Sequence, residues 1–158
     1  MILGTIISQE ATVVSLAPQR LCNALIRRSI ELRALYLHAA VEVNEPGLRS
    51  VLNENAQALE HLIAELQAQI RVLAGLPATR SHCMGTARRR FDTLLRGMPR
   101  SDDAWIRVLA REEAALLHAF ERALTVESGD MAPTLHRQLP RLNAIHSDMH
   151  SLARAVGH

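Results

Sequence analysis

The chain has 158 residues, enough to bury a core of ordinary size, and 48% of them are hydrophobic, which favours a single soluble globular domain. Aromatic residues make up only 3%, so the expected core consists of Leu, Ile, Val and Ala, as in packed helices rather than in sandwiches or barrels. All 18 basic residues are Arg, but a net charge of +2 is too small to predict a nucleic-acid or membrane partner.

Neither the cysteines nor the apolar start of the chain points to secretion. Cys22 and Cys83 fit no zinc-binding spacing and no disulfide framework, which favours a reducing, cytoplasmic location. Residues 1–7 are apolar, but no basic region precedes them, and Gln9 and Glu10 follow closely. We therefore expect neither a secretory signal nor a membrane-spanning helix.

Pro18 divides the chain into a short tail and one helical domain. Residues 1–18 carry β-branched residues and show no helical stripe of apolar residues. We expect them to form an N-terminal tail that lies on the domain or on a neighbouring subunit. Residues 19–158 then form a four-helix bundle domain.

Apolar residues at helical spacing predict four long helices in this domain. The first is expected to begin near Arg20 and to end at the turn of residues 44–47, and Ser101 is expected to cap the third. Pro140 lies inside the fourth helix, where it predicts a kink or a break. Two short turns favour an all-α, antiparallel bundle. The expected ranges are about 20–43, 48–73, 102–126 and 133–156.

A long connection, residues 79–100, separates the second helix from the third. It is longer than a helix hairpin needs, so we expect it to contain structure of its own. A short extra helix at about residues 85–96 would lay Phe91 and either Leu94 or Leu95 across the bundle.

The third helix carries an acid where its pattern requires an apolar residue. At about 100° per residue, Glu113 falls within the apolar stripe, so its carboxylate is expected to point inward. A buried acid requires a cation, a hydrogen-bond donor, a metal ion or a proton. The stripe consists of Trp105, Leu109, Leu116, Phe120, Ala123 and Leu124.

Four segments follow one another at a distinctive spacing: Tyr36–Ala40, Glu45–Leu48, Ala64–Arg71 and Arg111–Ala115. With these segments the chain resembles, over about residues 21–155, a bacterial family of unassigned function with a ferritin-like four-helix bundle. The resemblance implies a left-handed, up-down bundle related to ferritins and rubrerythrins. It also implies that Glu31 and Glu113 stand at the family's acids on the first and third helices, and His146 at its histidine on the fourth.

A complete di-iron site is not expected. Such sites use two Glu-x-x-His motifs together with acids from the other two helices, and this sequence contains no Glu-x-x-His. Part of a site remains, because Glu113 and His146, with Glu31 or His150, provide ligands for one zinc or iron ion. His146 and His150 also form an i, i+4 pair that can bind a metal ion on a helix surface.

The alternative is a purely structural pair. Glu113 facing His146 would form a charge-assisted hydrogen bond in the core, with Arg28 and Asn55 as further inward-facing partners. The remaining histidines are expected in solvent without partners; they are His38, His61, His82, His118, His136 and His158.

Two functional hypotheses follow from these patterns. The first is a non-enzymatic bundle without a cofactor, with a structural or protein-interaction role, for instance in stress, and a vestigial metal site. The second is a metal-binding ferritin-like protein with a mononuclear or residual di-metal site for Fe, Mn or Zn and a redox or storage role. We expect a cytoplasmic homodimer, open to a further protein partner. The run Arg88–Arg90 lacks interleaved aromatic residues, so no nucleic-acid partner is expected, and no membrane partner.

Overall fold

The computed structural model describes the backbone of residues 2–80, 93, 96–97 and 101–157, with side chains from Ala17 onward. Over these residues the chain is all-helical and contains no strand, in agreement with the expected all-α, four-helix class. Most of the extra helix expected at 85–96 lies outside the described residues, as do His82, Cys83, Phe91, Leu94 and Leu95. The four helices are α1 (Ile2–Glu42), α2 (Pro46–Val72), α4 (Asp102–Val126) and α5 (Ala132–Val156).

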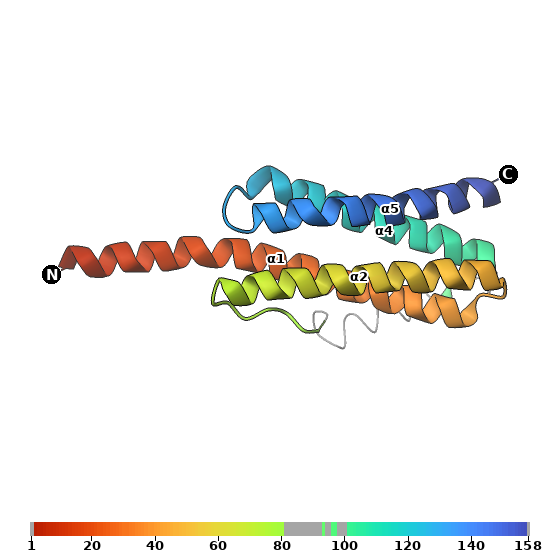
Figure 1. The fold of residues 1–158 in the computed structure, drawn as a ribbon, viewed down its shortest axis with the longest axis horizontal. Coiled ribbons are helices and arrows are strands. Elements are labelled where there is room, and N and C mark those ends of the chain that lie inside the picture. Colours follow the sequence, from red (N-terminus) through yellow and green to blue (C-terminus); the bar gives the residue numbers. More distant parts are fainter. Residues whose placement is uncertain (1, 81–92, 94–95, 98–100, 158) are drawn as a thin grey trace.

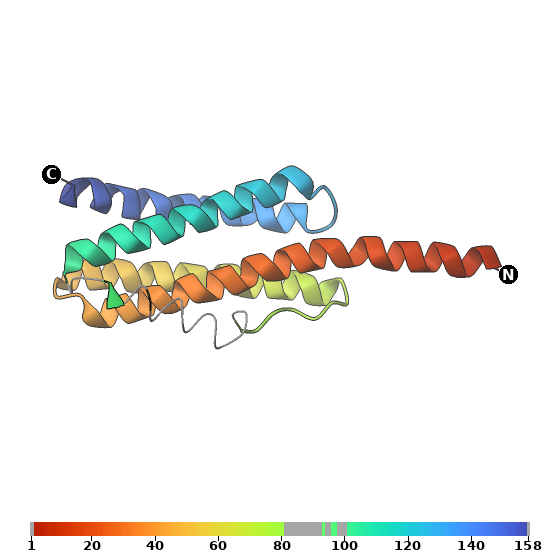
Figure 2. The ribbon, with the colours of Figure 1, turned by 180° about the vertical axis from the view of Figure 1, so that it is seen from behind.

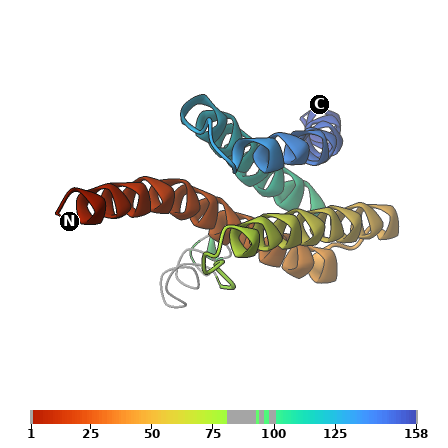
Figure 3. The ribbon, with the colours of Figure 1, turned by 60° about the vertical axis from the view of Figure 1, so that its left-hand side comes forward.

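The helices form two hairpins, α1 with α2 and α4 with α5, and within each hairpin the chain reverses direction (Figures 1 and 2). The principal contacts between the hairpins join α1 to α4 and α2 to α5. Each helix therefore has two main neighbours, and the order around the bundle is α1, α2, α5, α4. Figure 3 shows the two hairpins packed on each other from another side.

One end of the bundle is held by carboxylates at helix N-termini. Glu45 caps α2, and its side chain accepts hydrogen bonds from the backbone N–H groups of Gly47 and Leu48. Asp102, the first residue of α4, accepts from the backbone N–H groups of Asn44 at 2.9 Å and Glu45 at 3.0 Å. The start of α4 is thus tied to the turn between α1 and α2.

The other end of α2 docks on α1 through polar side chains. Gln19 Nε2 donates to the Leu73 carbonyl at 3.4 Å, and Asn23 Nδ2 donates to the Leu76 carbonyl at 3.0 Å. The Asn23 side chain also accepts from the backbone N–H of Ala78 at 2.7 Å. The level of residues 19–23 in α1 therefore marks the end of the bundle, and the part of α1 before Gln19 extends past it (Figures 1 and 2).

The expected start of the first helix near Arg20 is wrong, because α1 begins at Ile2 and runs through Pro18. At about 100° per residue, Ile2, Ile6 and Val13 lie within about 40° of one another on a helix, so β-branched residues concealed a helical repeat. Proline inside a helix removes one hydrogen bond and crowds the preceding turn, and α1 nevertheless continues past Pro18. Likewise α5 runs through Pro140 without a break.

The other helix ends agree with the expected ranges to within two residues, and the expected stripe of α4 is buried except for Leu124, which is partly buried. Ser101 caps α4 by accepting from the Ala104 backbone N–H at 3.2 Å. Burying each large apolar side chain contributes about 1.5–3 kcal/mol. None of the described helices is both long enough and apolar enough to cross a membrane. The largest fully buried side chains include Tyr36, Ile26, Leu52, Leu59, Leu62, Leu66, Ile70, Leu109, Leu116, Phe120, Met131 and Leu135.

Candidate functional site: a polar cluster inside the bundle

A polar side chain from each of the four helices contributes to one internal cluster. Tyr36 lies on α1, Asn55 on α2, Glu113 on α4 and His146 on α5. Tyr36 and Glu113 are fully buried and Asn55 is 4% exposed, whereas the His146 side chain is 39% exposed. The cluster therefore reaches from the centre of the bundle to the solvent through His146.

The contact between Glu113 and His146 confirms the expected hydrogen bond. His146 Nδ1 lies 2.8 Å from Glu113 Oε2, within the range of a charge-assisted hydrogen bond. Burial raises the pKa of the Glu113 carboxyl, and the hydrogen bond and charge of His146 oppose that rise. Arg28, expected as a further partner, is half-buried and makes no hydrogen bond or ion pair with Glu113 among the described contacts.

Tyr36 is kept neutral by its surroundings. Burial raises the pKa of the Tyr36 hydroxyl well above its usual range, and the negative charge of Glu113 raises it further. The Asn55 amide lies near the hydroxyl, outside the geometry of a well-formed hydrogen bond, and its N–H group lowers this pKa. The cluster therefore holds a neutral phenol and a neutral amide near a carboxyl group.

Three buried atoms of the cluster have no hydrogen-bond partner within the described part of the chain. They are Tyr36 Oη, Asn55 Nδ2 and Glu113 Oε1. An unsatisfied buried polar group costs about 1–3 kcal/mol, and more if it is charged. Two potential donors and one acceptor are thus held inside the bundle without a well-formed hydrogen bond.

The four metal-ligand candidates do not converge on one point. His150 lies beside His146, with ring centroids 5.7 Å apart and planes 20° apart, but it is exposed. Glu31 is half-buried on α1. Over the described ranges, no three His, Cys, Asp or Glu residues are placed to hold a metal ion together. Of these candidates, Glu113 and His146 form a hydrogen-bonded pair.

A second polar network, between α2 and α5, was missed by the sequence reasoning. Gln138 is fully buried, and its Nε2 donates to Glu65 Oε2 at 2.6 Å. Arg141 donates from Nη1 to Gln138 Oε1 and pairs through Nη2 with Glu65 Oε1, both at 2.8 Å. Hydrogen bonds from Arg141 and Gln138 lower the pKa of the Glu65 carboxyl.

Helical spacing contained a signal for this network. Gln138 follows Leu135 by three residues and precedes Leu142 by four, so it stands in the apolar stripe of α5. The structure buries Gln138 and leaves Leu139, the apolar residue next to it, only partly buried. A polar residue in a stripe marked an internal site here, as it did for Glu113.

His38 corrects the expectation that the remaining histidines lack partners. Its ring lies 5.7 Å from the Trp105 ring, with the planes tilted by 54°, across the contact between α1 and α4. His118 is exposed and lies 3.6 Å from the Glu121 carboxylate. His61 and His136 are exposed.

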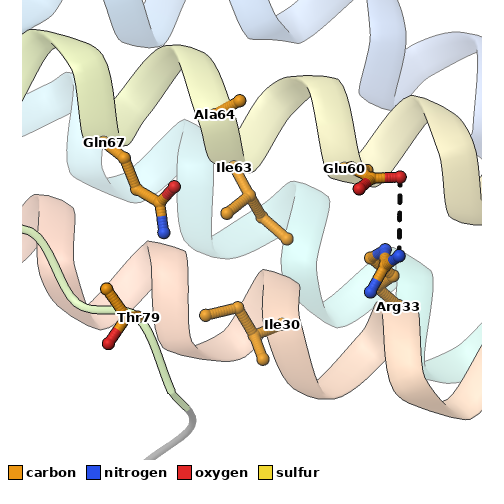
Figure 4. A pocket seen from close by; sticks show the side chains of 7 residues that line it. All are labelled: Ile30, Arg33, Glu60, Ile63, Ala64, Gln67 and Thr79. Carbon is orange, nitrogen blue, oxygen red and sulfur yellow. Dashed lines mark ion pairs between the residues drawn. The ribbon is translucent and has the colours of Figure 1, made fainter.

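A separate cavity of about 280 Å³ lies between α1 and α2 (Figure 4). Ile30 and Ile63 form its apolar walls, and Arg33 pairs with Glu60 at its rim, with Nη2 and Oε2 3.4 Å apart (Figure 4). Both charged side chains are partly exposed, so this ion pair contributes little stability. The lining is thus mixed, and its principal charges neutralise each other.

These features define a protein whose described residues form four long helices and no strand, with an acid–imidazole pair in its interior. The chain belongs to the family described as a domain of unknown function, DUF2383, whose sequence profile matches residues 20–127. Comparison with curated proteins and with solved structures gave no match. The matched region contains Tyr36, Asn55 and Glu113, whereas His146 lies beyond it.

Proposed function

We propose that this protein is a non-enzymatic, ferritin-like bundle with a structural or protein-interaction role in the bacterial cytoplasm. Its two hairpins, joined by a long connection, are compatible with the ferritin-like arrangement of antiparallel helices. Membership of a family of unknown function is compatible with the proposal and assigns no chemistry.

The observation that carries an interaction role is the length of α1. This helix has 41 residues, whereas α2 has 27 and α4 and α5 have 25 each. Its N-terminal part projects beyond the other three helices (Figures 1 and 2). Because most helical stability in proteins comes from packing of an apolar face, a partner that packs on this extension would stabilise it.

The internal cluster supports a structural reading of the vestigial site. The carboxylate of Glu113 is paired with the imidazole of His146, which forms a hydrogen bond with one of its two oxygens. The pair thereby bonds α4 to α5 in the interior. Loss of His146 would leave the buried Glu113 carboxylate without a partner, which is strongly destabilising, whereas loss of Glu113 leaves the 39% exposed His146 to the solvent.

One observation favours a second candidate, a metal-binding ferritin-like protein with a redox or storage role. Glu113 Oε1 is buried without a partner in the described structure, and His146 and His150 lie side by side near the surface. A carboxylate oxygen and imidazole nitrogens are ligands suited to Zn, Fe or Mn. Such a site would hold a single metal ion or would be the remnant of a di-metal centre.

Elemental analysis of protein purified without a histidine tag separates the two functions. The non-enzymatic proposal expects no stoichiometric Fe, Mn or Zn, and the same result for the Glu113→Ala variant. Glu121→Ala removes an exposed acid from the same helix and is the matched control. A stoichiometric metal content that is lost in Glu113→Ala, but kept in Glu121→Ala, would overturn the proposal in favour of the metal-binding protein.

A further inference from the structure

We propose that two copies of this chain associate through the α1 extension, residues 2–18, and the end patch, formed by Val72, Leu76 and Val126. The proposal deepens the proposed function by naming its partner, and it rests on the interaction role argued above. Each copy supplies both elements, so the contact is self-complementary.

The α1 extension leaves the bundle at a defined level. The bonds from Gln19 to the Leu73 carbonyl and from Asn23 to the Leu76 carbonyl fix α1 against the end of α2. The residues before Gln19 lie past that level, and at 1.5 Å per residue they project about 25 Å (Figures 1 and 2). Figure 3 shows from a further side that α2, α4 and α5 do not accompany them.

The sequence of the α1 extension is suited to burial. Glu10 is its single ionisable side chain, and Ile2, Ile6 and Val13 recur at the helical spacing noted above. Two such segments repel each other little. The absence of Arg and Lys from residues 2–18 disfavours an anionic membrane surface, which attracts helices with basic faces.

The end patch lies at the same end of the bundle. Val72 and Val126 are the last residues of α2 and α4, and Leu76 follows in the segment bound by Asn23. Their exposed fractions are 76%, 74% and 89%. The described chain holds few other large apolar side chains this exposed, Val41 being the clearest. Apolar exposure is thus concentrated where α1 leaves the bundle.

A second copy can cover both the α1 extension and the end patch, whereas one chain cannot cover them by itself. Because α1 is one continuous helix, the α1 extension points away from the end patch of its own bundle. Two copies in opposite orientation lay each extension beside the other and over the partner's end patch. One helix face about 25 Å long and 10 Å wide falls short of the roughly 800 Å² per partner typical of stable interfaces, and the end patch extends it.

Sedimentation equilibrium of the full chain tests the proposal, with circular dichroism to verify that each variant is folded. We expect a particle of twice the 17.5 kDa chain mass. The double variant Leu76→Gln with Val126→Gln should weaken dimerisation by about tenfold or more, as should Ile6→Asp with Val13→Asp. Val41→Gln, an equally exposed change at the other end of the helix, is the control and should leave dimerisation unchanged.

Monomers at all concentrations, or dimers insensitive to both double variants, would overturn the proposal. A monomer that binds neutral phosphatidylcholine vesicles through the α1 extension would also overturn the proposal, because the α1 extension would then bind a membrane and not a second copy of the chain. The elemental analysis is independent of these outcomes. A metal-free monomer refutes the dimer and leaves the non-enzymatic role, whereas a dimer with a Glu113-dependent metal refutes that role and leaves the dimer.

Discussion

Replacing Glu113 by leucine is expected to cost far less stability than replacing it by alanine. Glu113 is fully buried, with one oxygen bonded to His146 and the other without a partner among the described atoms. Leucine fills nearly the same space without a charge. Alanine removes the charge and leaves a cavity as well.

The magnitudes follow from these contacts. Both variants lose a hydrogen bond to a charged group, about 1.5–3 kcal/mol, and both remove the unpartnered oxygen, which returns about 1–3 kcal/mol. His146 is 39% exposed, so water can solvate its freed nitrogen in either variant. Leucine then gains about 1.5–3 kcal/mol from apolar burial. Truncation of large buried side chains to alanine costs about 2–5 kcal/mol.

The loss and the return nearly cancel, so we expect Glu113→Leu to be neutral or more stable than the native chain by up to a few kcal/mol, and Glu113→Ala to be about 2–5 kcal/mol less stable. Urea unfolding followed by circular dichroism measures both, provided the slopes agree. Glu121→Leu and Glu121→Ala, at an exposed position on α4, should differ by no more than about 0.5 kcal/mol. The reasoning would be refuted if the two Glu113 variants lost equal stability and if added metal stabilised the native chain but neither variant.

Three further predictions concern single side chains. Tyr36→Phe should change the free energy of unfolding by less than about 1 kcal/mol, or raise it, because the hydroxyl lacks a partner within the described chain; a loss above 2 kcal/mol in urea would show that it is bonded. Asp102→Ala should cost about 1–2 kcal/mol by freeing two backbone N–H groups, whereas Asp103→Ala, one residue on, should cost clearly less; equal thermal shifts would contradict this. For Glu65 the folded pKa is lowered, so the unfolded chain binds more protons and stability falls as pH drops below about 4.5. Urea titrations at successive pH values measure this fall, and Glu65→Gln should make it less steep. The exposed residue Glu54 provides the control, Glu54→Gln. If both variants gave the same pH profile, the Glu65 network would not be the source of the fall in stability.

Local patterns determined the helices and their inward faces. The stripe that placed Glu113 inside α4 depends on residues within one helix, as does the cap at Ser101, so each could be recognised without knowledge of the rest of the chain. The pairing of Glu113 with His146 was predicted from two sources: the inward position of Glu113 in its helix, and the family resemblance, which implies a histidine at position 146.

Only the tertiary structure decided which distant polar groups meet. Gln138 and Glu65 are 73 residues apart, and Asp102 and Asn44 are 58 apart. Contacts of this kind depend on how each helix is rotated and which neighbour it packs against, and the pattern of a single helix specifies neither. The continuation of α1 through Pro18 was also visible only in the structure. Residue propensity alone favours a helix end at proline, whereas α1 continues on both sides of Pro18.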